Sequence, residues 1–85
     1  MPYIEEKERE RFDAALVNAG RNVFAKGELT YCIYKLGVEV MKDIDVGYAN
    51  LSMIRSAMMD AADEWWYQKI RPYENKKKKE NGEVV

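Results

Sequence analysis

Hydrophobic residues recur along this 85-residue chain at the steps of three and four positions that mark helices. In residues 5–19, mixed charges fill the opening turns, and the acidic ones suit the positive end of a helix dipole. One buried face follows, made of Phe12, Ala15, Leu16 and Ala19. Gly20 is expected to end this helix, since glycine commonly stands at helix C-termini.

Residues 28–43 predict a second helix with two apolar stripes. One stripe consists of Leu29, Cys32, Ile33, Leu36 and Val40, and Gly37 lies on it, where it allows close approach of another helix. The opposite stripe consists of Tyr31, Tyr34, Val38 and Met41. A helix that is apolar on both sides is buried on both, and so short a chain has little material to cover it. One stripe is therefore expected to contact another subunit, unless the first residues or the C-terminal tail cover it.

A third helix is predicted over residues 50–71, with Asn50 as its N-cap. Its apolar seam repeats in alternating steps of three and four: Leu51, Ile54, Met58, Ala61 and Trp65. Pro72 lacks an N–H and disfavours helical backbone at the preceding residue, so the helix should end or kink at Arg71. A short helix from Tyr73 to about Glu80 is expected next, ended by Asn81-Gly82.

These elements predict an all-α fold, a small bundle of three main helices and a short C-terminal helix in one domain, 1–85. Residues 1–4 are expected to form an apolar strap and residues 76–85 a lysine-rich tail. A core of this size rarely supplies more than roughly 3–5 kcal/mol. The single cysteine, Cys32, excludes a disulfide within the chain and is expected to be a small buried hydrophobic residue. Oligomerisation is therefore expected to complete the bundle.

Charge and hydropathy restrict the partners and the cellular location expected for this chain. The formal net charge of −1 gives no overall attraction to double-stranded DNA. The run Lys76–Lys79 is expected to be a solvated, frayed tail. No apolar run approaches the roughly 18 residues that span a bilayer, and no signal-peptide core stands at the start, so a cytoplasmic location is expected.

The chain lacks most of the residue types and motifs on which enzymes rely for catalysis. The chain has no histidine and no phosphate-binding glycine loop, so no enzyme and no cofactor are predicted. Asp60 with Asp63 or Glu64 gives carboxylates on one helical face, which can hold Mg²⁺. All-helical nucleotide pyrophosphatases place such pairs on two helices, whereas the second helix here offers only Glu28 and Glu39. A solvated acidic face is the favoured interpretation, and no metal site is predicted.

A binding site is predicted instead beside Pro72, in the stretch that holds both tryptophans. A guanidinium can pair bidentately with phosphate or carboxylate while it stacks on a ring. The candidate ligand-binding residues are Tyr67, Arg71 and Tyr73, followed by Arg55 and Lys69. The alternative is that Arg71 caps carbonyls at the helix end or pairs with Glu74. The candidate interface residues are Tyr31, Tyr34, Val38, Met41, Trp65 and Trp66.

Several segments resemble a family of small uncharacterised proteins from phage and bacterial genomes. They are Pro2-Tyr3-Ile4, Gly27-Glu28-Leu29 with Tyr31 and Ile33, Tyr48-Ala49-Asn50-Leu51, Glu64, Pro72-Tyr73-Glu74, Lys76-Lys77 and Glu80 to Val84. The chain departs from the family pattern at Thr30, where asparagine is common, and at Trp66-Tyr67-Gln68, where Tyr-Arg-Arg is common. The resemblance implies a small viral accessory protein that acts inside a bacterium, and it brings no activity.

Two functions remain open at this point. The first is a non-enzymatic homo-oligomer that sequesters a small anionic ligand, such as a nucleotide signal of host defence. The second is a protein-interaction module that inhibits a host defence protein by direct binding, because Met, Tyr and Trp are enriched at protein interfaces.

Overall fold

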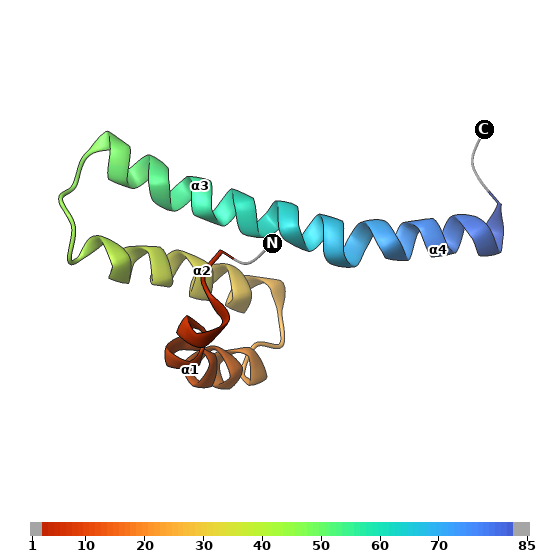
Figure 1. Cartoon of the computed structure of the whole chain (residues 1–85), viewed down its shortest axis with the longest axis horizontal. Coiled ribbons are helices and arrows are strands. Elements are labelled where there is room, and N and C mark those ends of the chain that lie inside the picture. Colours follow the sequence, from red (N-terminus) through yellow and green to blue (C-terminus); the bar gives the residue numbers. More distant parts are fainter. Residues whose placement is uncertain (1–2, 83–85) are drawn as a thin grey trace. The chain divides into compact units, whose positions relative to one another are not determined.

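The computed structural model describes residues 3–82, and every regular element among them is helical (Figure 1). The 3₁₀ turn η1 (Glu6–Glu8) precedes the helices α1 (Glu10–Arg21), α2 (Lys26–Met41) and α3 (Tyr48–Trp65). The π-helical turn η2 (Trp66–Ile70) and the helix α4 (Arg71–Asn81) complete the order. The described residues contain no strand, which confirms the all-α prediction. Of the predicted strap, Tyr3 and Ile4 are exposed, and residues 1–2 lie outside the described residues.

Contacts group the chain into two units, Met1–Leu36 and Gly37–Val85, so the division falls inside α2. In the first unit, α1 continues through Gly20 to Arg21, and the prediction that Gly20 ends the helix is wrong. Asn22 ends it instead: its backbone N–H bonds to the Ala19 carbonyl, and its side-chain amide donates to the Asn18 carbonyl at 2.8 Å. These bonds use carbonyls that the last turn of a helix otherwise leaves unpaired.

The start of α2 is held by a glutamate side chain. Glu28 Oε1 accepts hydrogen bonds from the backbone N–H groups of Phe24 at 2.7 Å and Ala25 at 3.0 Å. These donors lie just before the first turn of α2, so this is the glutamate half of a capping box. The negative charge also lies at the positive end of the helix dipole.

We expect Glu28→Ala to lower the free energy of unfolding by about 0.5–2 kcal/mol, as loss of a helix cap does. Glu28→Gln keeps the accepting oxygen and should lose only part of this. The measurement is urea denaturation followed by circular dichroism. If Glu28→Gln lowered the free energy of unfolding as much as Glu28→Ala does, the hydrogen bonds to the two N–H groups would contribute little to stability.

The start of α3 differs from the prediction that Asn50 is its N-cap. The helix begins at Tyr48, and the residue before it is Gly47, with extended backbone. Asn50 lies inside the first turn, where its side-chain amide donates to the Asp45 carbonyl at 2.7 Å. Asn50 therefore ties the α2–α3 loop to the helix.

Within the second unit, the end of α2 approaches α3 closely at Gly37. Gly37 is buried, and a Cβ atom placed on it would lie 3.0 Å from both Ile54 Cγ2 and Met58 Cε. Ile54 and Met58 are half-buried and belong to the seam of α3. The prediction that Gly37 allows close helix approach is confirmed.

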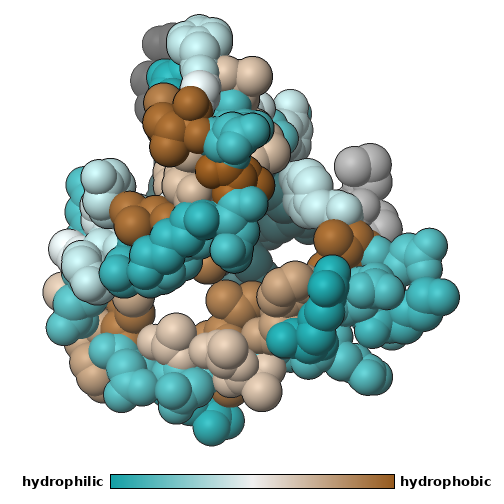
Figure 2. Space-filling view, turned by 90° about the vertical axis from the view of Figure 1, so that its left-hand side faces the viewer, coloured by the Kyte–Doolittle hydropathy of each residue, from teal (hydrophilic) through white to brown (hydrophobic). Residues whose placement is uncertain are grey.

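Outside this contact, most hydrophobic residues of the described chain lie open to solvent, and Val23, Met41 and Ile44 are half-buried. No hydrophobic residue among the described ones is buried, and Figure 2 shows hydrophobic side chains (brown) at the surface beside hydrophilic ones (teal). Both apolar stripes of α2 are exposed: the Leu36 side is represented by a residue that is 58% exposed, and the opposite side by Tyr34, which is 69% exposed. Cys32 is also exposed, so its predicted burial within the chain is wrong. Burial of apolar surface is the main force in folding, and the described residues of one copy supply little of it.

Candidate functional site

The region around Pro72 continues as helix. Arg71 has helical angles (φ −57°, ψ −47°), so the prediction that Pro72 moves it out of the helical region is wrong. The backbone departs from α-helical hydrogen bonding one turn earlier, in η2. There the Arg71 N–H bonds to the Trp66 carbonyl, five residues back. In an α-helix the Pro72 ring would clash with the carbonyl four residues back, that of Gln68. The wider turn changes the register before that clash arises, and α4 then starts with Pro72 in its first turn.

This π turn keeps aromatic residues on the seam of α3. It inserts one extra residue, so Trp65 is followed on the same side by Ile70 at five positions rather than four, and then by Tyr73. These three side chains are 60%, 37% and 60% exposed, respectively. We call four exposed residues of this region, three aromatic and one isoleucine, the aromatic cluster: Trp65, Trp66, Ile70 and Tyr73.

Two of the predicted ligand-binding residues lie together. The guanidinium carbon of Arg71 lies 5.8 Å from the centre of the Tyr67 ring, one helical turn away, within the range of a cation–π contact. No ion pair joins Arg71 to Glu74 or to any other acidic residue in the part of the chain that the structure describes. Among these described residues, the guanidinium therefore has an aromatic neighbour and no carboxylate at ion-pair distance.

The remaining candidates are not part of that pair. Tyr73 is two positions from Arg71 on α4, and residues two apart do not face each other on a helix. Arg55 precedes Tyr67 by twelve residues, about 18 Å along a helix. Lys69 lies between Tyr67 and Arg71, two positions from each, and so points to another side.

Tyr73 has a different cationic neighbour, Lys77, which is not among the residues predicted from the sequence. The Lys77 Nζ lies 5.6 Å from the centre of the Tyr73 ring and 3.2 Å from a carboxylate oxygen of Glu80. The spacing of four residues between Tyr73 and Lys77 is the signal that could have found it. Because Glu80 neutralises Lys77, Arg71 is the better site for an added anion.

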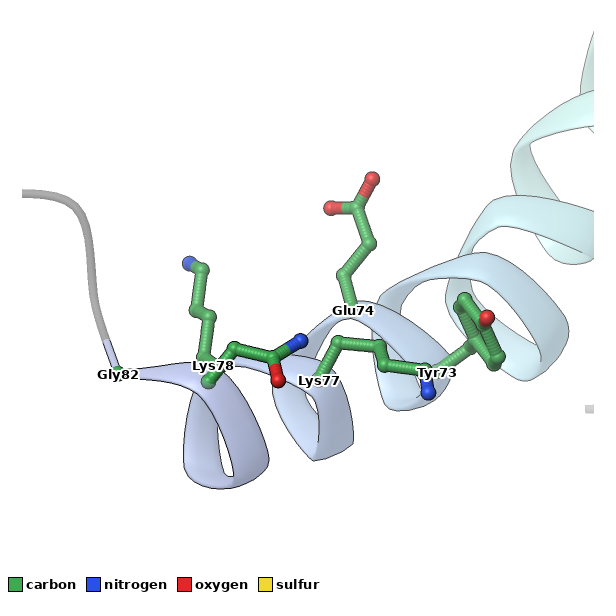
Figure 3. A pocket seen from close by; sticks show the side chains of 6 residues that line it. Tyr73, Glu74, Lys77, Lys78 and Gly82 are labelled. Atoms are coloured by element: carbon green, nitrogen blue, oxygen red, sulfur yellow. The ribbon is translucent and has the colours of Figure 1, made fainter.

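A shallow depression of about 300 Å³ lies beside this second pair. Figure 3 shows that its lining side chains all extend from α4 and the residue after it, with no facing element. The lining residues are Tyr73, Glu74, Lys77, Lys78, Asn81 and Gly82. Small-molecule sites normally enclose most of their ligand, whereas this surface is lined from one side. The helix α4 runs to Asn81, so the prediction that Lys76–Lys79 is frayed is wrong.

The carboxylates of α3 do not form a metal centre. The described residues contain no group of three or more His, Cys, Asp or Glu side chains placed to hold a metal ion, and this includes Asp60, Asp63 and Glu64. Among the candidate interface residues, Tyr31, Tyr34, Val38, Trp65 and Trp66 are exposed, and Met41 is half-buried. In residues 3–82, no helix is long and apolar enough to cross a bilayer.

We expect Pro72→Ala to raise the stability of the helix and to weaken self-association of the chain. Alanine restores the N–H and removes the ring, which together cost about 3 kcal/mol in a helix interior, although the π turn offsets part of that cost. An α-helical register would then rotate Ile70 and Tyr73 away from the side of Trp65. The checks are the melting temperature, expected to rise, and self-association, expected to weaken. A rise in both would contradict this role of the π turn.

Comparison with known protein families gives a match over nearly the whole chain. The family model described as "Domain of unknown function (DUF6899)" covers residues 1–84. No curated protein and no solved structure matches the chain. The expected resemblance to a family of uncharacterised proteins is therefore confirmed.

Proposed function

We propose that this chain, which belongs to the DUF6899 family, is a non-enzymatic homo-oligomer that binds and sequesters a small anionic ligand. The observation that carries the proposal is the Arg71 guanidinium beside the Tyr67 ring, without an ion pair to any carboxylate of residues 3–82. The resemblance to phage proteins supports a finer proposal: a viral accessory protein in the bacterial cytoplasm, with a nucleotide signal of host defence as its ligand.

The chemistry of this pair favours a ligand that carries both a negative charge and a ring. A guanidinium binds phosphate through two parallel hydrogen bonds, and an exposed tyrosine ring offers a face for stacking. The second pair, Tyr73 and Lys77, repeats this combination six residues further along the helix, about 9 Å away. Nucleotides combine these features, whereas inorganic phosphate has only the charge.

We expect Arg71→Ala to weaken nucleotide binding at least tenfold, because a hydrogen bond to a charged group contributes about 1.5–3 kcal/mol. The measurement is isothermal titration calorimetry of the full chain with adenine and guanine nucleotides, and with inorganic phosphate as the anion that lacks a ring. The melting temperature without ligand should change by less than about 2 °C, since Arg71 is exposed.

The matched control is Arg55→Ala, which removes the same charge from α3 at a distance from Tyr67. It should leave the dissociation constant for nucleotide within about twofold of the wild-type value, because exposed charges so far apart are screened by salt. Equal losses for both variants would indicate non-specific attraction and would contradict a site at Arg71. A large fall in melting temperature for Arg71→Ala, with binding retained, would assign Arg71 a structural role.

The second candidate function is a protein-interaction module that inhibits a host defence protein. Exposed methionines favour it: Met53 and Met59 lie at the surface of α3, and flexible thioether side chains adapt to varied partner surfaces. A chain that responds to no nucleotide in the titration, yet forms a stoichiometric complex with a purified defence protein, would support this alternative.

A further inference from the structure

We propose that the backbone carbonyl of Tyr67 recognises the base of the ligand, by accepting a hydrogen bond from an amino group on a nucleobase. The inference rests on the proposed function, in which Arg71 binds the phosphate of the same nucleotide and the Tyr67 ring stacks on its base. It narrows the ligand class to nucleotides whose base carries an exocyclic amino group.

The Tyr67 carbonyl has lost both of its helical partners. A carbonyl in a helix accepts from the N–H four residues on, or five residues on in a π turn. Four residues on, the Arg71 N–H bonds to the Trp66 carbonyl instead. Five residues on stands Pro72, which has no N–H. No side-chain hydrogen bond of residues 3–82 ends on this carbonyl either, so within that part of the chain it is an acceptor without a donor.

This unpaired acceptor lies in the same turn as the Arg71 guanidinium. Helix carbonyls point toward the C-terminus, so the Tyr67 carbonyl is directed at the turn that contains Arg71. Side chains lean the other way, which brings the guanidinium back over Tyr67, 5.8 Å from its ring centre. Tyr67, Arg71 and Pro72 are all exposed, so one ligand can reach the carbonyl, the cation and the ring together.

The chemistry of this turn selects a hydrogen-bond donor as well as a negative charge. A carbonyl oxygen is an acceptor only, so the group that pairs with it must be an N–H or O–H and cannot be an ionised phosphate oxygen. The base is the part of a nucleotide that stacks on the Tyr67 ring, so its edge lies closest to the carbonyl of the same residue. A π turn within an α-helix is frequent at functional sites, and here it creates the acceptor.

Two matched pairs of nucleotides test the contact. Purine riboside monophosphate lacks only the amino group of adenosine monophosphate, and inosine monophosphate lacks only that of guanosine monophosphate. In isothermal titration calorimetry of the full chain, the amino-bearing member of at least one pair should bind about three- to tenfold more tightly, as one hydrogen bond contributes. Equal dissociation constants within both pairs would overturn the inference and leave the anion site at Arg71 intact. Absence of binding by any of these nucleotides would end the proposed function, and the inference with it.

Pro72→Ala removes the unpaired acceptor without changing Tyr67 or Arg71. Alanine restores the N–H at this position. In the π register this N–H pairs with the Tyr67 carbonyl, and in an α-helical register the Arg71 N–H does so. The preference for the amino-bearing nucleotide should then fall below about twofold, because a helical donor takes the place of the ligand's. Two nucleotides are compared in one variant, so a change in overall affinity cancels. A preference as large as that of the wild type would show that the amino group is recognised elsewhere.

A single nuclear magnetic resonance signal reports on this carbonyl directly. Gln68 is the only glutamine in the sequence, so isotope labels in the tyrosine carbonyl carbons and the glutamine backbone nitrogen give one carbonyl–amide cross-peak, from Tyr67 and Gln68. Stacking of the base shifts this peak for both members of a nucleotide pair. A hydrogen bond to the carbonyl adds a downfield shift of the carbon for the amino-bearing member alone. The same carbon shift with both members at saturation would overturn the inference.

Discussion

Trp65→Ala is expected to raise the dissociation constant for self-association at least about 30-fold. Trp65 is more than half exposed on a single copy, at the end of the α3 seam and within the aromatic cluster. Loss of a buried tryptophan at the centre of an interface costs about 2 kcal/mol or more, and each 1.4 kcal/mol is a factor of ten. In a symmetric dimer the substitution removes two such side chains, so the true effect should exceed this minimum.

The matched control is Tyr48→Ala, at the start of the same helix. Tyr48 is 87% exposed and lies seventeen residues from Trp65, outside the aromatic cluster. It should change self-association by less than about threefold. Sedimentation equilibrium over a range of protein concentrations measures both variants. If Trp65→Ala behaves like Tyr48→Ala, the aromatic cluster is not the interface.

Gly37→Leu is expected to lower the free energy of unfolding by about 1–3 kcal/mol, the usual cost of overfilling a packed contact. A Cβ atom alone would already lie 3.0 Å from Ile54 Cγ2, and a β-branched side chain in a helix has little rotamer freedom to move away. Met58 Cε is the end of a flexible chain and can shift, so Ile54 sets the cost.

Gly20→Leu provides the control for Gly37→Leu. Gly20 lies within α1, and a Cβ atom there would meet nothing within 4 Å. Leucine should stabilise that helix by about 0.5–1 kcal/mol, because glycine is a poor helix former. Urea denaturation of both variants should therefore give changes of opposite sign. Stabilisation by Gly37→Leu would show that α2 and α3 do not meet at this position.

Much of the helical framework follows from the sequence alone. The apolar periodicity of α2 and α3 predicts both helices to within two residues at each end, except for the C-terminal end of α3. The sequence also predicts the close approach at Gly37, because a glycine on an apolar stripe costs helix stability and needs a packing reason. The Tyr67–Arg71 pair likewise follows from a spacing of four residues, which is a local property of helices.

The errors arise where two local rules compete. Pro72 disfavours helix at Arg71, but a one-residue change of register in η2 lets the helix continue, and no pattern in the sequence marks that change. Gly20 and Asn50 are both good terminal residues, yet Asn22 and Gly47 stand at the actual ends because neighbouring residues continue the helix. The burial of a side chain is harder to predict from sequence than the end of a helix. Cys32 lies on an apolar stripe, but whether that stripe is covered depends on contacts beyond α2 itself.

We expect the exposed apolar surface of this chain to be buried between copies. Light scattering of the full chain after size-exclusion chromatography, at tens of micromolar in physiological salt, tests it most directly. We expect a mass of twice the 10.0 kDa chain or a higher multiple. A mass of one chain, together with cooperative thermal unfolding at that concentration, would contradict the account.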